Sequence, residues 1–241
     1  MRSVSRARTA QPKRSRSPDK RSKPEAVPTT GASRIDIRAL TPSRWPDLEA
    51  IFLARGCSVA RGCWCMFYRV SGAHILPPGV TLAQARRSEL KALVDRGRPP
   101  GLIGYRGRTP VGWVSIGPRE DYARLRRSPV MKAVDAVPVW SIVCFVVPAE
   151  HRGQGLARQL LAGAIDYAAR RGATVVEAYP VDKPGHCADE TMWFGAKSMF
   201  DAAGFREVAR RKATRPVMRL RIGRRTRQRA SAAKTAERTS S

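Results

Sequence analysis

A short turn with two glycines joins an apolar segment to a helical pattern. The β-branched segment 140–147 predicts a buried strand, and Pro148 ends it. From Gly155 onward, apolar residues recur at helical spacing and predict a helix over 155–171. Such a turn presents several backbone N–H groups at the positive end of the helix dipole, and glycines let an anion approach them closely. The turn at Arg152–Arg158 therefore predicts a site for a phosphorylated cofactor.

A single charged residue interrupts another apolar strand. Glu177 lies in the middle of Val-Val-Glu-Ala-Tyr, within a strand predicted over 174–179. A charge in such a strand is costly unless it faces a cleft or has partners. A carboxylate that faces a cleft can act as a general base, whereas one with partners would be an ion-paired residue on the sheet. Both interpretations stay open at this point.

Three of the five cysteines, Cys57, Cys63 and Cys65, lie close together in the sequence. One interpretation is a metal site completed by His186 or Cys187, and the other is a set of small, buried or half-buried loop residues. The Cys-x-Cys spacing lacks the usual gap of structural zinc sites, and there is no second Cys pair, so we expect no metal. An odd number of cysteines without an export signal also argues against a disulfide framework. Cys187 as an acyl-carrying nucleophile is a minor alternative.

The chain of 241 residues is strongly basic, with a formal net charge of +27. Residues 1–34 hold ten Lys and Arg against Asp19 and Glu25, and residues 223–241 hold six against Glu237. Both segments are poor in large apolar residues, so we expect two disordered basic tails. Such tails can bind nucleic acid, but no aromatic residue is interleaved for base stacking, so solvated extensions are favoured. The remaining positive charge would help to hold a ligand with several phosphates.

The apolar runs of the chain are too short to cross a bilayer, and the N-terminal residues contain no apolar segment of a secretory signal. We therefore expect a cytoplasmic protein without membrane partners. The preference for Arg over Lys is typical of a bacterial source of high GC content.

Local patterns predict the elements that position the turn and Glu177. Pro46 allows a helix through Leu53, and Thr81 with Gln84 has the pattern of a capping box, so a second helix is expected to about residue 95. The other expected elements are a strand 34–40, a loop or broken helix 56–78, a hairpin of 101–106 and 110–116, an irregular segment 118–138, a helix 191–203, and strands 205–208 and 217–222. This order predicts one α/β or α+β domain over residues 35–222.

The order of these elements, with Arg152-Gly-Gln-Gly-Leu-Ala157 between a strand and a helix, resembles the GCN5-related N-acetyltransferase (GNAT) family. The signature of that family is Gln/Arg-x-x-Gly-x-Gly/Ala, and Arg152, Gly155 and Ala157 fill its fixed positions. A second marker is an aromatic residue after a helix-ending glycine, which Gly204-Phe205 matches. The resemblance implies a mixed, mostly antiparallel central sheet flanked by helices.

The resemblance also implies acetyl-CoA as the donor, an amine as the acceptor and no metal. The amides of Gly153–Arg158 would hold the CoA diphosphate, and the strand Phe145–Val147 would pair with the pantetheine amides through its main chain. Glu177 matches in position the glutamate base that some members carry, and it is the catalytic candidate. The implied cofactor-binding residues are Phe145, Val146, Val147, Arg152, Gly153, Gln154, Gly155, Leu156, Ala157 and Arg158.

Two positions depart from the family pattern. The usual general acid is a Tyr four residues before the glycine of Gly-Phe, and here Phe200 stands in its place. Phenylalanine cannot donate a proton. Another group (Tyr179, Ser198, Cys144 or water) would therefore protonate the departing thiolate of CoA, or this thiolate leaves unassisted. The common proline before the turn is also shifted by one residue, to Pro148.

We therefore expect an N-acetyltransferase that moves an acetyl group from acetyl-CoA to a primary amine by direct attack in a ternary complex. The amine could belong to a small molecule or to a protein. Two alternatives stay open: a catalytically weak CoA-binding regulatory module, and a nucleic-acid-associated protein that acts through its basic tails. The acceptor pocket would draw on the aromatic residues Trp64, Phe67, Tyr68, Trp113, Tyr122 and Trp140.

Overall fold

A computed structural model describes residues 34–72, 75–183 and 192–223 of the chain. The two basic tails predicted from the sequence lie outside these residues, apart from Arg34 and Gly223, and so do His186 and Cys187. The order of the elements is β1 (Asp36–Ala39), α1 (Trp45–Leu53), α2 (Ser58–Cys63), α3 (Leu82–Asp95), β2 (Gly101–Arg106), β3 (Thr109–Pro118), α4 (Ala123–Arg127), β4 (Trp140–Val146), α5 (Leu156–Arg170), β5 (Val175–Ala178), α6 (Lys197–Ala202), β6 (Arg206–Arg210) and β7 (Pro216–Arg221).

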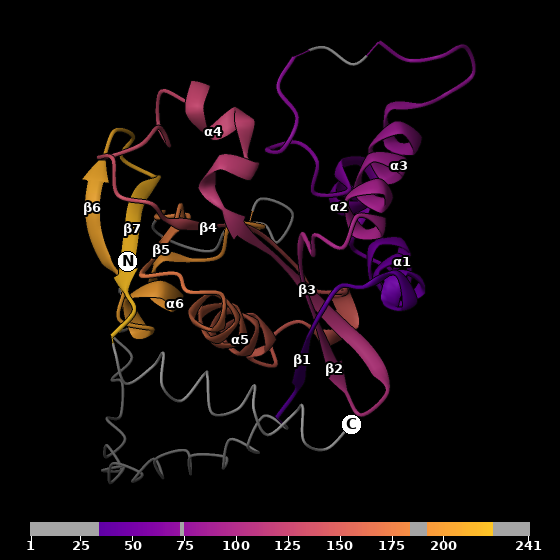
Figure 1. The fold of residues 1–241 in the computed structure, drawn as a ribbon. Helices are drawn as coiled ribbons and strands as arrows, with labels where there is room; N and C mark the ends of the chain where they lie inside the picture. The colour runs from indigo at the N-terminus through magenta and orange to yellow at the C-terminus, as the bar shows by residue number, and fades with distance from the viewer. Residues whose placement is uncertain (1–33, 73–74, 184–191, 224–241) are drawn as a thin grey trace, which may run out of the picture. The chain divides into compact units, whose positions relative to one another are not determined.

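The strands form one mixed sheet in the order β1-β2-β3-β4-β5-β7-β6 (Figure 1). All neighbouring strands are antiparallel except β4 and β5, which are parallel. Helix α5 supplies the crossover between these two strands, as a parallel pair requires. The prediction of a mixed, mostly antiparallel sheet flanked by helices is confirmed.

The helices cover the two faces of this sheet. Alternate residues of β2 and β3 point to opposite faces: Leu102 and Val114 belong to the apolar cluster around α5, whereas Ile103 and Trp113 belong to the cluster around α1, α2 and α3. Helix α5 buries its apolar side against the first cluster, including Leu160. The helix prediction over 155–171 and its end at Gly172, which has a φ of +85°, are both confirmed.

The early helices also follow the sequence pattern. Thr81 caps α3, and the reciprocal bond from Gln84 completes the capping box. Within the segment 56–78, the predicted broken helix is present as the short helix α2.

One predicted helix is shorter than expected. The sequence pattern predicted it over 191–203, but α6 begins only at Lys197. Gly195 has a φ of +77°, outside the helical region, and Ala196 pairs with Val181 in a parallel bridge. Residues 192–195 therefore form a turn, closed by the bond from the N–H of Gly195 to the carbonyl of Met192 at 2.7 Å, and Ala196 lies beside the sheet.

Strands β4 and β5 separate along their length. Their pairing covers only Trp140–Ile142 opposite Val176–Ala178. The next residue of β4, Val143, has no partner in the register with β3, which steps from Ser115↔Cys144 to Ile116↔Ile142. An extra residue of this kind is a β-bulge, which bends the strand. The bulge lies where β4 leaves β5, and it opens the sheet on the side of the glycine turn.

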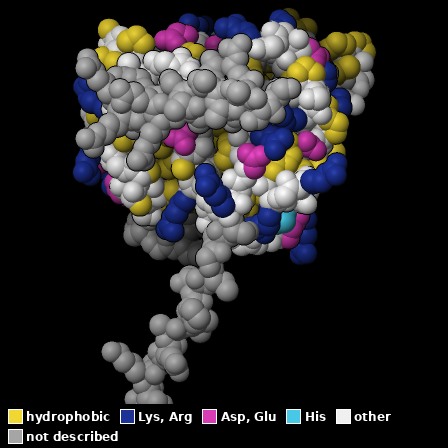
Figure 2. All heavy atoms as spheres, turned by 60° about the horizontal axis from the view of Figure 1, so that its bottom comes forward, with side chains coloured by type: hydrophobic (Ala, Val, Ile, Leu, Met, Phe, Trp, Pro, Cys, Tyr) yellow, Lys and Arg dark blue, Asp and Glu magenta, His cyan; other side chains and the backbone are white. Residues whose placement is uncertain are grey.

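On the face that Figure 2 shows, the basic side chains are spread out rather than gathered at one point. In Figure 2, Lys and Arg alternate with Asp, Glu and apolar residues across the visible face. Among the described residues, no helix has the length and apolar character that spanning a membrane requires.

Candidate functional site

A cavity of about 1000 Å³ lies at the opening between β4 and β5. Its wall is formed by the glycine turn, by β4, by the loop around α2, and by the turn 192–195 before α6. The lining residues that bear on function are Cys57, Cys63, Cys65, Phe67, Tyr68, Arg86, Cys144, Phe145, Val146, Val147, Arg152, Gly153, Gly155, Leu156, Ala157, Arg158, Lys183 and Trp193. The structure thus places nine of the ten predicted cofactor-binding residues on one cavity.

The turn itself is open to the cavity. Gly153 and Gly155 have φ values of +72° and +73°, a region that favours glycine, and Gly155 is the N-cap residue of α5. A Cβ atom at either position would meet no atom within 4 Å. Helix α5 has no acidic residue in its first turn. The positive end of its dipole therefore faces the cavity without a local carboxylate to neutralise it.

Gln154 is the one predicted cofactor residue that does not line the cavity. Its side chain accepts a hydrogen bond from Arg106 at 2.8 Å and donates one to the carbonyl of Glu150 at 3.0 Å. These bonds stabilise the turn through a side chain that does not line the cavity. A role of its backbone amide stays a prediction.

The guanidinium of Arg152 ties the turn to its surroundings. It donates to the carbonyl of Val147 at 3.1 Å and to the carbonyl of Gly56 at 2.6 Å. These bonds connect the end of β4, the turn and the loop after α1. Arg152 thus holds the cavity wall together through backbone carbonyls.

The main chain of β4 on the cavity side is already engaged. The N–H of Phe145 donates to the carbonyl of Trp193 at 2.6 Å, and the carbonyl of Val147 accepts from Arg152. The turn 192–195 before α6 therefore occupies part of the position predicted for pantetheine. A cofactor that pairs with Phe145 must displace the carbonyl of Trp193.

Glu177 does not line the cavity. Its side chain is fully buried, and both of its oxygens have cationic partners: Arg119 at 2.6 Å on Oε1 and Arg219 at 2.8 Å on Oε2. Tyr179 also donates to Oε1 at 2.6 Å. The sequence left open whether Glu177 faces a cleft or is an ion-paired residue on the sheet. The structure shows it as an ion-paired residue. Its role as a general base stays a prediction.

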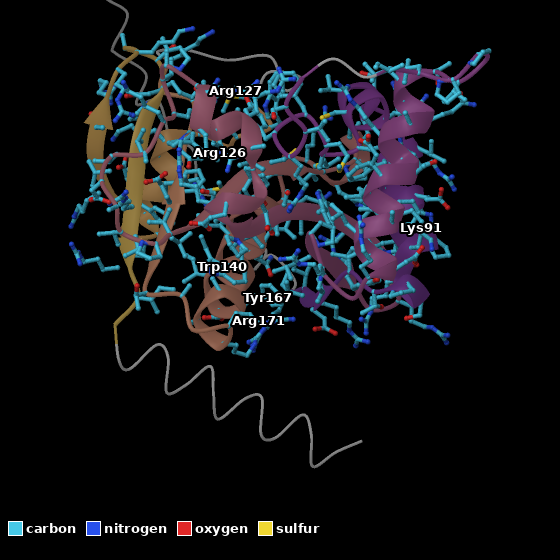
Figure 3. All side chains as sticks on the ribbon, turned by 45° about the horizontal axis from the view of Figure 1, so that its top comes forward. Lys91, Arg126, Arg127, Trp140, Tyr167 and Arg171 are labelled. Carbon is cyan, nitrogen blue, oxygen red and sulfur yellow. The ribbon has the colours of Figure 1, made fainter. Side chains whose placement is uncertain are left out.

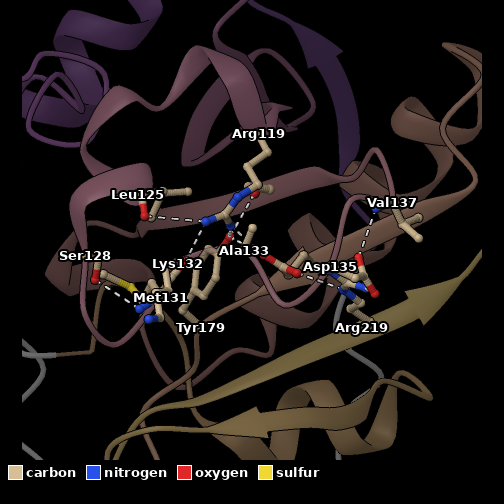
Figure 4. Close-up of polar contacts among 12 residues, drawn as sticks. Arg119, Leu125, Ser128, Met131, Lys132, Ala133, Asp135, Val137, Tyr179 and Arg219 are labelled. Atoms are coloured by element: carbon tan, nitrogen blue, oxygen red, sulfur yellow. Dashed lines mark hydrogen bonds and ion pairs between the residues drawn. The ribbon is translucent and has the colours of Figure 1, made fainter.

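The partners of Glu177 join three segments (Figure 4). Arg119 donates to the carbonyls of Met131 and Leu125, and it bonds the hydroxyl of Tyr179. Arg219 reaches Asp135 at 2.7 Å. Burial, followed by the charge of Glu177, raises the pKa of Tyr179 well above its usual value, so its hydroxyl keeps its proton. This cluster fixes the segment 119–135 against β5 and β7.

Phe200 is buried in the position where the family has its general acid. Its ring packs edge-on against Phe145 and Phe205 at centroid distances of 6.2 Å and 5.1 Å. These contacts make it a core residue.

The six aromatic residues proposed for an acceptor pocket divide into three groups. Phe67 and Tyr68 line the cavity, whereas Trp64, Trp113 and Tyr122 are buried in the core. Trp140 instead packs on the α5 side, where its ring lies 5.9 Å from that of Tyr167, and Arg171 covers Tyr167 (Figure 3). The prediction is therefore wrong for Trp64, Trp113, Tyr122 and Trp140. Trp193, which lines the cavity, was missed because the sequence pattern assigned it to a helix over 191–203.

Four thiols also line the cavity: Cys57, Cys63, Cys65 and Cys144. Among the described residues, no group of three His, Cys, Asp or Glu is arranged to hold a metal ion. In the sequence, Cys144 is one residue of an apolar strand, and nothing connects it with Cys65, which is 79 positions away.

Comparison with known proteins identifies the family of this domain. The model of one protein family, whose members are acetyltransferases, matches residues 73–188, from before α3 to beyond β5. That model is described as "Acetyltransferase (GNAT) family", so the chain carries an acetyltransferase domain of the GNAT family, and the resemblance seen in the sequence is confirmed. No curated protein matches the chain.

Several solved structures share the arrangement of elements at low identity. An acetyltransferase from Thermus thermophilus is 20% identical, with 80% of this chain and 100% of that one covered and a TM-score of 0.45. The protein yncA from Salmonella typhimurium, solved with its cofactor acetyl-CoA, is 17% identical over 80% and 96% of the two chains, with a TM-score of 0.44. The ribosomal-protein-alanine N-acetyltransferase from Brucella melitensis is 19% identical over 78% and 99%, with a TM-score of 0.43. These likenesses concern the fold alone.

Proposed function

We propose that this protein transfers an acetyl group from acetyl-CoA to a primary amine by direct attack in a ternary complex. The observation that carries the proposal is the glycine turn at the N-terminus of α5, which opens into one end of the cavity. The family match supports the acyl donor. A diphosphate at the turn would accept the amide hydrogen bonds of Gly153–Arg158 and lie at the positive end of the helix.

The rest of the cavity suits the remainder of the cofactor and an acceptor. From the turn, the wall continues along Val147, Val146 and Phe145 toward Phe67 and Tyr68. An apolar wall of this kind excludes water from the thioester, so the amine rather than water reaches the carbonyl carbon. Arg158 and Lys183 on the wall add positive charge for phosphate groups.

Calorimetry with acetyl-CoA tests the proposal directly. The whole chain should bind acetyl-CoA with micromolar affinity that persists at moderate salt, because the turn is a shaped site rather than a diffuse charge. If moderate salt abolishes the binding of acetyl-CoA, as it would the nonspecific binding of any polyanion to a basic protein, the proposal is contradicted. An amine screen with detection of free CoA thiol then tests transfer separately from binding.

A second candidate is a CoA-binding module without efficient transfer. Phe200 specifically favours it, because the position of the usual proton donor is a buried aromatic residue. Acetyl-CoA binding without CoA release on any amine would support this candidate.

Binding should also change the fluorescence of Trp193. The pantetheine can pair with the N–H of Phe145 only by replacing the carbonyl of Trp193, which moves the indole in the cavity wall. We expect a change in tryptophan emission on titration with CoA, and its loss in Trp193→Phe. Trp45→Phe is the control, because Trp45 lies in the cluster around α1 and should leave the change intact. Binding by calorimetry without any emission change would show that pantetheine does not displace the segment.

A further inference from the structure

We infer that Cys65 and Cys144 form a redox-sensitive thiol pair in the cavity wall, which hydrogen peroxide converts to a disulfide. The two residues come from different parts of the chain. Cys65 lies in the loop after α2, and Cys144 lies in β4 next to the bulge. Both line the cavity, and both thiols are free. Cys144 also packs against the apolar cluster that contains Cys65, so a small oxidant that enters the cavity can reach both sulfurs.

The backbone around Cys65 holds its thiol in a fixed direction. Trp64 and Cys65 both have left-handed backbone angles, with φ values of +47° and +51°. Such angles are uncommon outside glycine and persist only where the surrounding structure enforces them. The ring of Trp64 stacks on Trp45 and contacts Phe52, which anchors the turn. Anchored in this way, the turn directs the side chain of Cys65 toward β3 and β4.

Trp113 and Cys144 both pack in the cluster that holds Cys65. The indole Nε1–H of Trp113 donates to Sγ of Cys65 at 3.3 Å, in a buried setting. The thiol of Cys144 lies 3.8 Å from the carbonyl of Phe145, to which it can donate. Trp113 and Cys144 lie on adjacent strands, β3 and β4, whose register brings Ser115 opposite Cys144. The sheet thus fixes the indole and the thiol of Cys144 relative to each other.

These contacts divide the roles of the two sulfurs. The hydrogen bond from Cys144 lowers the pKa of Cys65, and the indole of Trp113 and the charge of Arg69 act in the same direction against burial. The same thiol–thiol bond, together with burial, raises the pKa of Cys144 well above its usual value. Cys65 is therefore the more acidic of the two thiols and the one that supplies the thiolate, which is the reactive form. Cys144 keeps its proton and acts second.

The chemistry balances with peroxide as the oxidant. The thiolate of Cys65 attacks one oxygen of hydrogen peroxide, the O–O bond breaks, and a sulfenic acid forms on Cys65 with release of hydroxide. The sulfur of Cys144 then attacks the sulfur of the sulfenic acid and gives up its proton, an S–S bond forms, and water leaves. The two thiols lose two electrons, and the peroxide is reduced to water. A dithiol reductant reverses the step by thiol–disulfide exchange.

The other two cavity cysteines serve as matched controls. Burial raises the pKa of Cys57 and of Cys63. Cys63 is only two residues from Cys65, so Cys63→Ser tests whether any cysteine of this loop, rather than Cys65 in particular, forms the disulfide. Cys57 lies at the start of α2 and tests general access of the oxidant to the cavity.

Mass spectrometry of the whole protein after brief treatment with peroxide tests the pair, without any cofactor. Trypsin releases Cys63 and Cys65 on residues 62–69 and Cys144 on residues 133–152, so the disulfide appears as one linked peptide that dithiothreitol separates. We expect this linked peptide in the parent chain and in Cys57→Ser and Cys63→Ser. We expect at least a tenfold loss in Cys65→Ser and in Cys144→Ser.

Two results would overturn the inference. One is a linked peptide that persists in Cys65→Ser, which would assign the bond to Cys63. The other is Cys144 that remains free to alkylation in the unfolded, peroxide-treated chain. Circular dichroism checks that each variant is folded, and Cys65→Ala provides a second variant if Cys65→Ser is not. Because no acetyl-CoA is present, the result is independent of the proposed transfer activity.

Discussion

Gly155→Glu is expected to weaken acetyl-CoA binding at least about a hundredfold, because a carboxylate at this position would repel the diphosphate at close range. The backbone amides around Gly155 form the N-terminus of α5, and a side chain added there projects into open space on the cavity. The added carboxylate would also occupy the positive end of the helix, which the proposal assigns to the cofactor. Titration calorimetry on the whole chain at one salt concentration measures the change.

Gly172→Glu is the matched control for this variant. Gly172 has a φ of +85°, and a Cβ atom there also meets no atom within 4 Å, but it lies after the other end of α5 and does not line the cavity. The two variants share the same charge change and a similar cost of holding a non-glycine residue at a left-handed φ, of about 1–2 kcal/mol. We expect Gly172→Glu to bind acetyl-CoA like the parent. Equal losses in both variants would point to a general effect on α5, and unchanged affinity in Gly155→Glu would remove the turn from the site.

The turn could be predicted from the sequence because its determinants are local. A strand, two glycines and a helix within about twenty residues fix the backbone angles and the direction of the dipole. The capping box at Thr81 and the hairpin of β2 and β3 were predictable for the same reason. Each depends on residues only a few positions apart.

Other features depend on contacts between distant segments. No sequence pattern indicated that the carbonyl of Trp193 would reach Phe145, because the turn 192–195 is placed by contacts with distant residues, including the bridge of Ala196 to Val181. The pairing of Cys65 with Cys144 has the same origin, since only the folded sheet brings the two thiols together. Periodicity cannot reveal either contact.

Trp140 shows a different limit of the sequence pattern. Aromatic residues near a predicted cleft were candidates for its wall, but the side of the strand decides where each points. Trp140 pairs in β4 with its ring on the face of α5, against Tyr167. The bulge at Val143 then changes the alternation, so the face of each later residue in β4 could not be counted from Trp140.

Removing the carboxylate of Glu177 should destabilise the protein strongly. In Glu177→Ala, Arg119 would lose its acidic partner and both arginines would lose the buried carboxylate that joins them, which typically costs about 3–5 kcal/mol in the free energy of unfolding. Urea denaturation of parent and variant measures the difference. Glu207→Ala is the control, because the pair of Glu207 with Arg210 lies at the surface, where water screens it, and should contribute far less. Similar losses in the two variants would contradict a structural role of Glu177.

The isosteric variant Glu177→Gln separates structure from catalysis. It keeps the shape of the side chain and one oxygen for Arg119, so it should fold and bind acetyl-CoA with parental affinity. If Glu177 is the general base, turnover at neutral pH falls and the limb of the pH–rate profile that reports the base disappears. If Glu177 only holds Arg119 and Arg219 in place, turnover changes by a constant factor and the profile keeps its shape. The second outcome fits a carboxylate that has two guanidinium partners and does not line the cavity. In that case, the general base should be sought among the residues that line the cavity.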